Sequence, residues 1–351
     1  MCPFLRFLVY FGCNIRCGIC VELFASSARN DSLALYTEKT SRPLSSEMSV
    51  GECFVFQHVL VAGIGALGSE VVKNLGLLGC ESVFIADADL LEAKNIARSV
   101  LVREDAVVGE SKVAYALDRL PAWFPRTHWS GAPTEIADVE PEQFLKAEVL
   151  FSCVDTDLAR TEIAALAARY KLPVCDAGLG GTSTRVGRVS WFPGVDSAAC
   201  FACLLSSKRR AQLFSMWESD VHGCWARDQG GTASWTSTTS MASIVAGFQV
   251  ELAISAIKRQ GGAFSVHLDL DRAPISQTIQ HHPSAECPLH ADMPGTLFPV
   301  CTFAECAACG THFFPNRRIG WVRRWGACPS CGSRDLMIRD SLRDEPIQRA
   351  S

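Results

Sequence analysis

The chain has 351 residues, of which 48% are hydrophobic and 20% are charged. At about 150 residues per domain, this length predicts two domains, or one domain with a sizeable appendage, in a folded protein. The net charge of −4 argues against nucleic acid or an anionic membrane as the main partner. No apolar run reaches the roughly 18 residues that a membrane helix needs. Seventeen cysteines, several in C-x-x-C pairs, indicate metal thiolates in a reducing cytoplasm, not a disulfide framework.

Residues 1–47 are expected to be an N-terminal extension without a structural role, either disordered or preceding a true start at Met48. The segment is apolar and rich in cysteine. However, Asn14 and Arg16 interrupt the apolar run, and its charged region consists of Arg6 alone. We therefore do not expect a secretory signal peptide.

Strands and helices alternate from residue 58 onward. The first unit consists of a strand at 58–63 (HVLVAG), a helix at 66–79 and a strand at 82–87; a second consists of a strand at 148–154, a helix at 158–170 and a strand at 172–178. This alternation predicts an α/β fold, a doubly wound, mostly parallel Rossmann-like sheet with helices on both faces.

A long helix and a final strand are predicted after an irregular stretch between Cys203 and Met241 that is rich in Ser, Thr, Gly and Trp. Irregular stretches of this length in compact domains are usually functional or disordered. The helix covers 241–258 and the strand 263–270. At helical spacing, its core-facing side chains are predicted to be Ile244, Val245, Phe248, Leu252 and Ile257.

A glycine turn, GIGALG, follows the first strand and opens the first helix. Gly63, Gly65 and Gly68 match G-x-G-x-x-G, in which backbone N–H groups and the helix N-terminus hold a phosphate. Asp87 ends the next strand, where a carboxylate accepts hydrogen bonds from ribose hydroxyls. These features suit NAD and ATP equally, and the absence of G-x-x-x-x-G-K-[ST] excludes a P-loop.

The charged residues beyond the glycine turn favour a triphosphate over a dinucleotide. Arg98 and Lys112 could neutralise phosphate charge, and Asp155, at the end of a buried strand, could hold Mg²⁺. Taken singly, each charge could instead be a solvated surface side chain. The residues after the second strand are closely spaced: DADLLEAKNIAR contains Asp87, Asp89, Asn95 and Arg98.

Several ordered motifs between residues 58 and 292 resemble the ThiF/MoeB/HesA and ubiquitin-activating-enzyme family of adenylyltransferases. They are GIGALG, DADLLEAKNIAR, GESK, CVDTDLAR and GRVSWFPGVDSAACFACL. The resemblance implies binding of ATP and Mg²⁺ and adenylation of the C-terminal carboxylate of a ubiquitin-like or sulfur-carrier protein. It also implies release of pyrophosphate and, in some members, transfer to a conjugating enzyme.

The resemblance also implies roles for single residues. Asp87 would bind the ribose and Asp155 the magnesium, and Asp89 matches a second family aspartate of less certain role. The residues that would bind phosphates are Asn95, Arg98 and Lys112. The chain departs from the family in lacking an upstream R-Y-x-R-Q segment, for which Arg42 is a poor substitute. This leaves open whether the chain forms the usual homodimer.

Two sets of cysteine and histidine residues have zinc-ligand spacing. The first comprises Cys200, Cys203, Cys287 and His290, in which His290 stands where the family usually has a cysteine. The alternative is a pair of buried thiols with a surface histidine. The second, in C-x2-C-x18-C-x2-C, comprises Cys306, Cys309, Cys328 and Cys331. It predicts a zinc ribbon, which barely folds without its metal.

The spacing of these motifs divides the chain into an adenylation domain at 48–295, a zinc-ribbon-like module at 296–340 and a tail at 341–351. Between the two ribbon pairs, NRRIGWVRRW interleaves arginines with tryptophans. This segment could contact nucleic acid or an acidic protein, but we favour a solvated hairpin.

Cys224, in VHGCWARDQGG, is the candidate reactive thiol because it lies in a polar loop. The resemblance places a thioester- or persulfide-forming cysteine in this loop in many members, and an inert buried thiol is the alternative. In contrast, four cysteines in or beside apolar elements are expected to be core residues: Cys53, Cys80, Cys153 and Cys175.

Two other classes of function stay open on sequence alone. One is a NAD-dependent oxidoreductase on the same glycine turn, in which Arg98, Lys112 and Asp155 have no assigned role. The other is a non-catalytic zinc adaptor that acts through the ribbon.

Overall fold

The computed structural model describes residues 56–180, 183–218, 237–259, 261–290, 300–301 and 303–338. All of them belong to one compact unit, Cys53–Ser351. The N-terminal extension, Cys53 and Cys224 lie outside the described residues.

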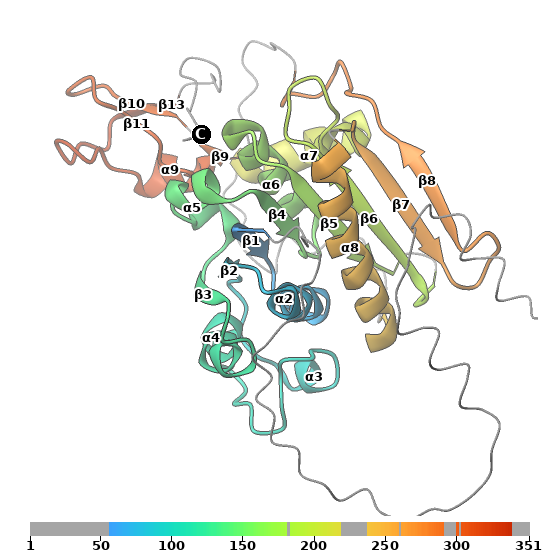
Figure 1. The fold of residues 1–351 in the computed structure, drawn as a ribbon. Helices are drawn as coiled ribbons and strands as arrows, with labels where there is room; N and C mark the ends of the chain where they lie inside the picture. Colours follow the sequence, from blue (N-terminus) through green and yellow to red (C-terminus); the bar gives the residue numbers. More distant parts are fainter. Residues whose placement is uncertain are drawn as a thin grey trace, which may run out of the picture. The chain divides into compact units, whose positions relative to one another are not determined.

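An eight-stranded sheet is the centre of the fold (Figure 1). In spatial order its strands are β3 (His128–Ala132), β2 (Ser82–Ala86), β1 (His58–Ala62), β4 (Val149–Ser152), β5 (Val174–Leu179), β6 (Val186–Phe192), β7 (Phe264–Asp269) and β8 (Ser276–Gln280). Pairing is parallel from β3 through β5 and antiparallel from β5 through β8. The α/β, Rossmann-like prediction is therefore confirmed, whereas β3, β6 and β8 were not predicted.

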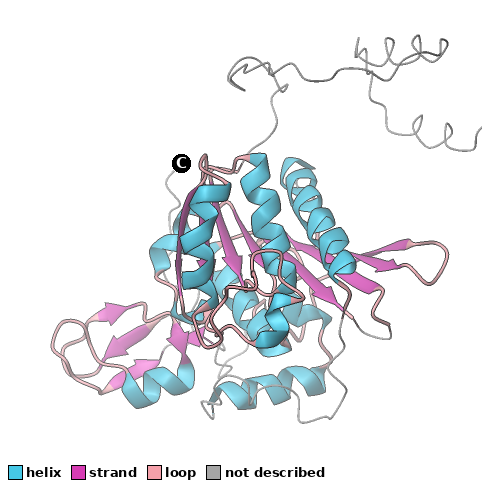
Figure 2. Ribbon diagram, turned by 90° about the horizontal axis from the view of Figure 1, so that it is seen from below, coloured by secondary structure: helices cyan, strands magenta, loops and turns pink. Residues whose placement is uncertain are grey.

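Helices cover both faces of the sheet (Figure 2). They are α2 (Ala66–Leu78), α3 (Ala93–Ile96), α4 (Lys112–Trp123), α5 (Pro141–Lys146), α6 (Asp157–Tyr170), α7 (Ser207–Glu218) and α8 (Thr239–Arg259), with 3-10 turns η2 (Ile136–Asp138) and η3 (Phe201–Leu204). One core lies under α2, α4 and α8, and the other lies under α5 and α6.

The residues of β1 explain why the sheet needs two helical layers. Val59 and Val61 belong to the first core, whereas Leu60 and Ala62 belong to the second, and all four are at most 2% exposed. Successive side chains of a strand point to opposite faces, so a continuous apolar run must be covered on both sides.

Helix α8 packs against α2, β5 and β6. It is the one described helix whose length and composition would suit a membrane, with a mean hydropathy of 1.5, but 50% of that window is buried inside the protein. The prediction of a core helix holds, but the assignment of Ile244 and Phe248 to its core face is wrong, since they are 45% and 37% exposed. The buried stripe instead follows Met241, Val245, Gln249, Leu252 and Ala256, which leaves Ile244 and Phe248 at its margin.

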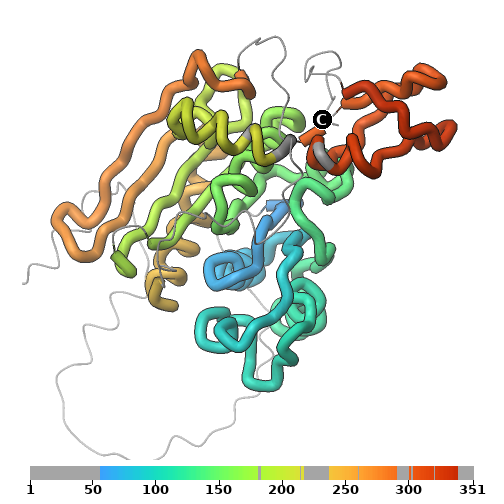
Figure 3. The backbone as a smooth tube through the Cα atoms, turned by 180° about the vertical axis from the view of Figure 1, so that it is seen from behind, coloured from blue at the N-terminus to red at the C-terminus, as the bar shows by residue number. Residues whose placement is uncertain are grey.

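The residues from 300 to 338, here named the C-terminal module, form two small sheets and a helix. Their elements are β9 (Val300–Cys301), β10 (Ala304–Cys306), β11 (His312–Phe313), β12 (Arg317–Arg318), α9 (Ile319–Trp325) and β13 (Leu336–Ile338). Strand β12 packs against η2. In Figure 3 the red C-terminal module lies beside the green part of the chain that contains η2. The interpretation of the arginine-rich segment as a solvated hairpin is wrong at Arg318, which is 8% exposed.

Candidate active site

A cleft of about 680 Å³, here named the strand-end cleft, opens at the carboxyl ends of β1, β2 and β4. This is the topological switch point of the sheet, because the helices that follow β1 and β4 cover opposite faces. The cleft is lined by seven of the predicted nucleotide-site residues: Gly63, Gly65, Asp87, Asp89, Arg98, Lys112 and Asp155.

The three glycines of the turn have different structural reasons to lack a side chain. Gly63 has φ +88°, and a Cβ there would lie 2.8 Å from the carbonyl oxygen of Cys153. A Cβ on Gly68 would lie 2.0 Å from the Gly63 oxygen, whereas one on Gly65 meets no atom within 4 Å. Gly63 and Gly68 therefore permit close packing, and Gly65 keeps the cleft open at the N-terminus of α2.

Asp87 joins the end of β2 to the glycine turn. Its carboxylate accepts hydrogen bonds from the backbone N–H groups of Ile64 and Asp89, each at 2.7 Å. Burial raises the pKa of Asp87 above its usual range, while the Lys112 ammonium and the two N–H donors oppose this shift. The carboxylate is thus held at one position with lone pairs left for a ligand.

Two cations line the cleft near Asp87. Lys112 is the first residue of α4, and its ammonium lies 2.8 Å from the Asp89 carboxylate. The side chain of Lys112 is 10% exposed. Arg98 follows α3 and is half-buried, and it makes no ion pair with any residue that the structure describes. Both can therefore face an anion bound in the cleft.

Asp155 and Asn95 differ in their relation to the cleft. Asp155 is exposed in the loop between β4 and α6, and its carboxylate has no partner among the described side chains. Such an oxygen donor fits a hard cation such as Mg²⁺. Asn95 instead caps α3, accepting a hydrogen bond from the Glu92 N–H at 2.7 Å, and it lines a small neighbouring pocket with Lys112.

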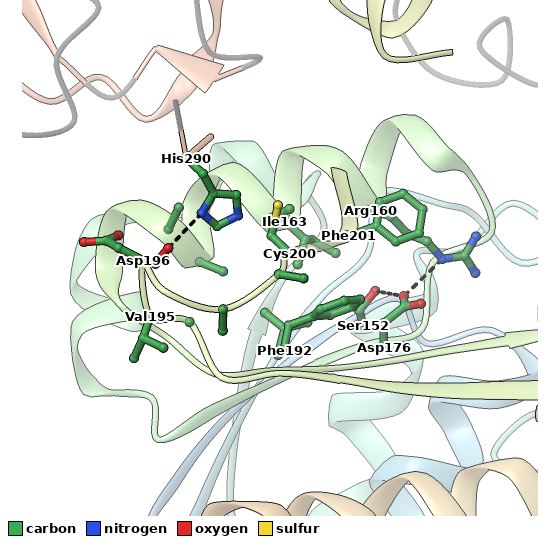
Figure 4. Close-up of a pocket in the computed structure, with 17 residues that line it drawn as sticks. Ser152, Arg160, Ile163, Asp176, Phe192, Val195, Asp196, Cys200, Phe201 and His290 are labelled. Atoms are coloured by element: carbon green, nitrogen blue, oxygen red, sulfur yellow. Dashed lines mark hydrogen bonds and ion pairs between the residues drawn. The ribbon is translucent and has the colours of Figure 1, made fainter. Parts of the chain in front are cut away.

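An arginine that was not singled out from the sequence, Arg160, also lines the cleft. It binds the buried Asp176 carboxylate at 3.0 Å, as does Arg188, and Ser152 donates to the same carboxylate at 2.7 Å. Figure 4 shows Arg160, Ser152 and Asp176 at one end of a narrow second cavity, and Cys200 and His290 further along it. The CVDTDLAR motif, which ends at Arg160, was the available signal for this residue.

The cysteines predicted as core residues have different environments. Cys80 and Cys175 are buried, as predicted. Cys153 is half-buried and lines the strand-end cleft. Burial raises the pKa of the Cys153 thiol, which therefore stays protonated at neutral pH.

The first predicted metal cluster is assembled from η3 and the segment after β8. Cys200 Sγ lies 3.8 Å from Cys203 Sγ and 3.7 Å from Cys287 Sγ. Zinc–sulfur bonds of 2.3 Å in a tetrahedron place sulfurs about 3.8 Å apart, so the spacing fits Zn²⁺. His290 Nδ1 lies 3.2 Å from the Asp196 carbonyl oxygen, and a hydrogen bond there would make Nε2 the ligating atom toward a bound ion.

The second cluster brings together the four cysteines of the C-terminal module. Cys306 and Cys331 have sulfurs 3.6 Å apart, as do Cys309 and Cys328. All four sulfurs lie within 4.8 Å of one another, which again fits a tetrahedral ion. The sequence spacing therefore predicted both groupings, and each could hold a metal.

The structure combines a Rossmann-like sheet with a cleft at a glycine turn that opens the first helix. The chain belongs to the ThiF family, which it matches over residues 54–268. This match confirms the resemblance found in the sequence.

Two individual relatives match only part of the chain, at 27% identity. The chain is 27% identical to SUMO-activating enzyme subunit uba-2 of Caenorhabditis elegans over 132 residues, 37% of this chain and 22% of the relative. It is 27% identical to the NEDD8-activating enzyme E1 catalytic subunit of Saccharomyces cerevisiae over 158 residues, 42% of this chain and 51% of the relative. The matched region thus covers between about a fifth and about half of the length of these relatives.

Among solved structures, Escherichia coli MccB with succinimide has the same fold. The TM-score is 0.50 at 16% sequence identity, over 67% of this chain and 66% of the MccB chain.

Proposed function

We propose that this protein is an adenylyltransferase that uses ATP and Mg²⁺ to activate the C-terminal carboxylate of a ubiquitin-like or sulfur-carrier protein. The main support is that the glycine turn, Asp87, Arg98, Lys112 and Asp155 line one cleft. Family membership and the relatives that activate SUMO or NEDD8 add to it.

The chemistry requires this balance of charge. An oxygen of the partner's carboxylate attacks the α-phosphorus of ATP, the bond between the α- and β-phosphates breaks, and pyrophosphate leaves. Since the carboxylate is ionised at neutral pH, the protein needs no general base. It must instead offset the repulsion between two anions, which Arg98 and Lys112 can do at the cleft wall.

The remaining residues of the cleft would bind and orient the substrates. The glycine turn would hold phosphate on its N–H groups, and Asp87 would accept from the ribose. Asp155 would hold Mg²⁺, which supplies further neutralisation of the phosphates. Asn95 caps α3 through its Oδ1 alone, so its amide N–H groups could still donate to a phosphate.

The proposal also assigns zinc to the two cysteine clusters and a thioester to Cys224. Both cysteine clusters would hold Zn²⁺ as closed structural sites, because each offers four ligands and no coordination position is left for water. After adenylation the acyl group could pass to the Cys224 thiolate, with release of AMP. A conjugating enzyme would then be the next partner.

Exchange of radioactive pyrophosphate into ATP tests the proposal when ubiquitin-fold proteins from the same genome, ending in Gly-Gly, are added. We expect exchange with the cognate partner, and none from Asp155→Ala. Unaltered exchange by Asp155→Ala would contradict the site assignment. Tight NADH binding without ATP binding would favour an oxidoreductase instead. Intact mass measurement of the protein after the reaction would show an acyl adduct, and its loss in Cys224→Ser would place it on that residue.

A further inference from the structure

One arginine of the C-terminal module, Arg318, reaches the wall of the strand-end cleft. Its Nε donates to Glu162 Oε1 at 2.5 Å and its Nη2 donates to Glu162 Oε2 at 3.3 Å. The same guanidinium pairs with Glu135. All three side chains line the cleft, and Glu162 is 1% exposed.

The partners of Arg318 belong to two elements that both line the cleft and pack against each other. Glu162 lies on α6, directly after the loop that carries Asp155. Glu135 precedes η2, in the connection that leaves β3 beside β2. Arg318 therefore joins these two elements, and both carboxylates need its charge because the cleft is proposed to receive an anionic nucleotide.

The neighbours of Arg318 fix its backbone to the same two elements. Asn316 is fully buried, and it donates to the Val139 carbonyl oxygen at 3.0 Å and accepts from the Tyr170 hydroxyl at 3.2 Å. Arg317 pairs with Asp138 at 3.2 Å. The contact is thus a built interface, and not one long side chain reaching across solvent.

The position of this segment in the chain links it to the second metal cluster. Residues 316–318 lie between Cys309 and Cys328, which the cluster brings to a sulfur separation of 3.6 Å. A closed cluster therefore ties together the two ends of the stretch from Cys309 to Cys328 that carries this segment. A module of this size depends on its metal for folding.

We propose that Arg318 is a positioning residue for the nucleotide, through which metal occupancy of the Cys306, Cys309, Cys328 and Cys331 cluster controls ATP affinity. It neutralises Glu135 and Glu162 and fixes α6 relative to the connection after β3. The coupling is reciprocal, so bound ATP retards loss of the metal from the module. This inference rests on the proposed function in requiring that the cleft bind ATP.

Calorimetric titration of the full-length, zinc-loaded protein with ATP and Mg²⁺ tests the positioning role. Arg318→Ala should raise the Kd of ATP about tenfold, within the usual range of coupling between sites. Adding Glu162→Gln to Arg318→Ala should recover part of the affinity, because it removes the buried one of the two uncompensated charges. Arg323→Ala, an exposed arginine of α9, is the matched control and should leave the Kd within about twofold.

Steady-state kinetics distinguish a positioning role of Arg318 from a general loss of structure. In the pyrophosphate exchange assay Arg318→Ala should raise KM for ATP while kcat stays within about threefold, and Arg318→Lys should recover part of the effect. A general loss of folding would instead lower kcat and would not be reversed by Glu162→Gln.

Metal release gives a readout that does not depend on activity or on any variant that could misfold. With 4-(2-pyridylazo)resorcinol as chelator, one of the two zinc ions should leave the wild-type protein at least about threefold more slowly when ATP and Mg²⁺ are saturating. In Arg318→Ala that protection should disappear. Wild-type protein that does not bind ATP overturns the proposed function itself. ATP binding with the same Kd in Arg318→Ala, or zinc release unaffected by ATP in the wild type, overturns this inference alone.

Discussion

The carboxylate of Asp87 accepts a hydrogen bond of 2.7 Å from the backbone N–H of Ile64, so the end of β2 and the glycine turn form one rigid unit. The same carboxylate accepts from the Asp89 N–H. Any ligand that binds Asp87 is therefore positioned against the N-terminus of α2 at the same time. Preorganisation of this kind lowers the entropic cost of holding two reactants.

Replacing Asp87 should weaken both ATP binding and the fold. Asp87→Ala removes the ribose acceptor and leaves two N–H donors without their acceptor, and hydrogen bonds to charged groups contribute about 1.5–3 kcal/mol each. We expect the Kd of ATP to rise at least about tenfold in calorimetric titration. Asp118→Ala, at a carboxylate that is 77% exposed, serves as the control. Equal ATP affinity in Asp87→Ala and the wild type would contradict the ribose assignment.

Replacing two glycines of the same turn should have different effects, one on stability and the other on ATP binding. Gly68→Ala puts a Cβ 2.0 Å from the Gly63 oxygen, so we expect the free energy of unfolding to fall by about 3 kcal/mol in urea titration. Gly65→Ala meets no atom within 4 Å and should change stability by less than about 1 kcal/mol. Its methyl group nevertheless projects where phosphates would lie, so ATP binding should be lost. A stable Gly65→Ala protein with normal ATP affinity would show that phosphate binds elsewhere.

Metal analysis should find two zinc ions per chain, one for each cluster. Cys328→Ser should retain one, because it breaks only the cluster of the C-terminal module. Cys287→Ser should also retain one but destabilise the protein more, since Cys287 is part of the core beneath α5 and α6. Mass spectrometry of the native protein and thermal unfolding measure both effects. Zinc content that does not change in either variant would show that the clusters are not metal sites.

The strand-end cleft could be predicted from the sequence because each of its main residues lies within a short motif. Gly63, Asp87 and Asp155 each end or follow an apolar strand, and the carboxyl ends of parallel strands meet at one edge of a sheet. The same local reasoning found β1 and α2 to within two residues at either end. It missed β3, β6 and β8, whose sequences HWSGA, VGRVSWF and SQTIQ interrupt the apolar residues with small, polar or charged ones.

Arg318 could not be predicted, because its burial depends on contacts with residues distant in the sequence. Within NRRIGWVRRW nothing separates Arg318 from Arg323, yet the first is 8% exposed and the second is exposed. The difference arises from Glu162, which is more than 150 positions away. Similarly, Ile244 and Phe248 of α8 satisfied the helical period but lie beside the stripe that meets α2.

The stability of the protein should depend on His281 below neutral pH. His281 Nε2 lies 2.6 Å from the Ser265 hydroxyl, and that hydroxyl lies 2.7 Å from the hydroxyl of Ser190, which is buried between β5 and β7. Burial, aided by the positive charge of Arg188, lowers the pKa of His281 below its ordinary value of 6.5. The unfolded chain therefore takes up a proton at a higher pH than the folded protein does.

It follows that the contribution of His281 to stability is fully present above pH 6.5 and is lost as the pH falls from there through the lowered pKa. Urea unfolding between pH 5.5 and 8 should show the free energy of unfolding declining toward acid, and His281→Gln should make that decline shallower. His282→Gln, at the exposed neighbouring position, should retain the wild-type slope. A slope that His281→Gln leaves unchanged would mean that other groups, and not this imidazole, govern the loss of stability in acid.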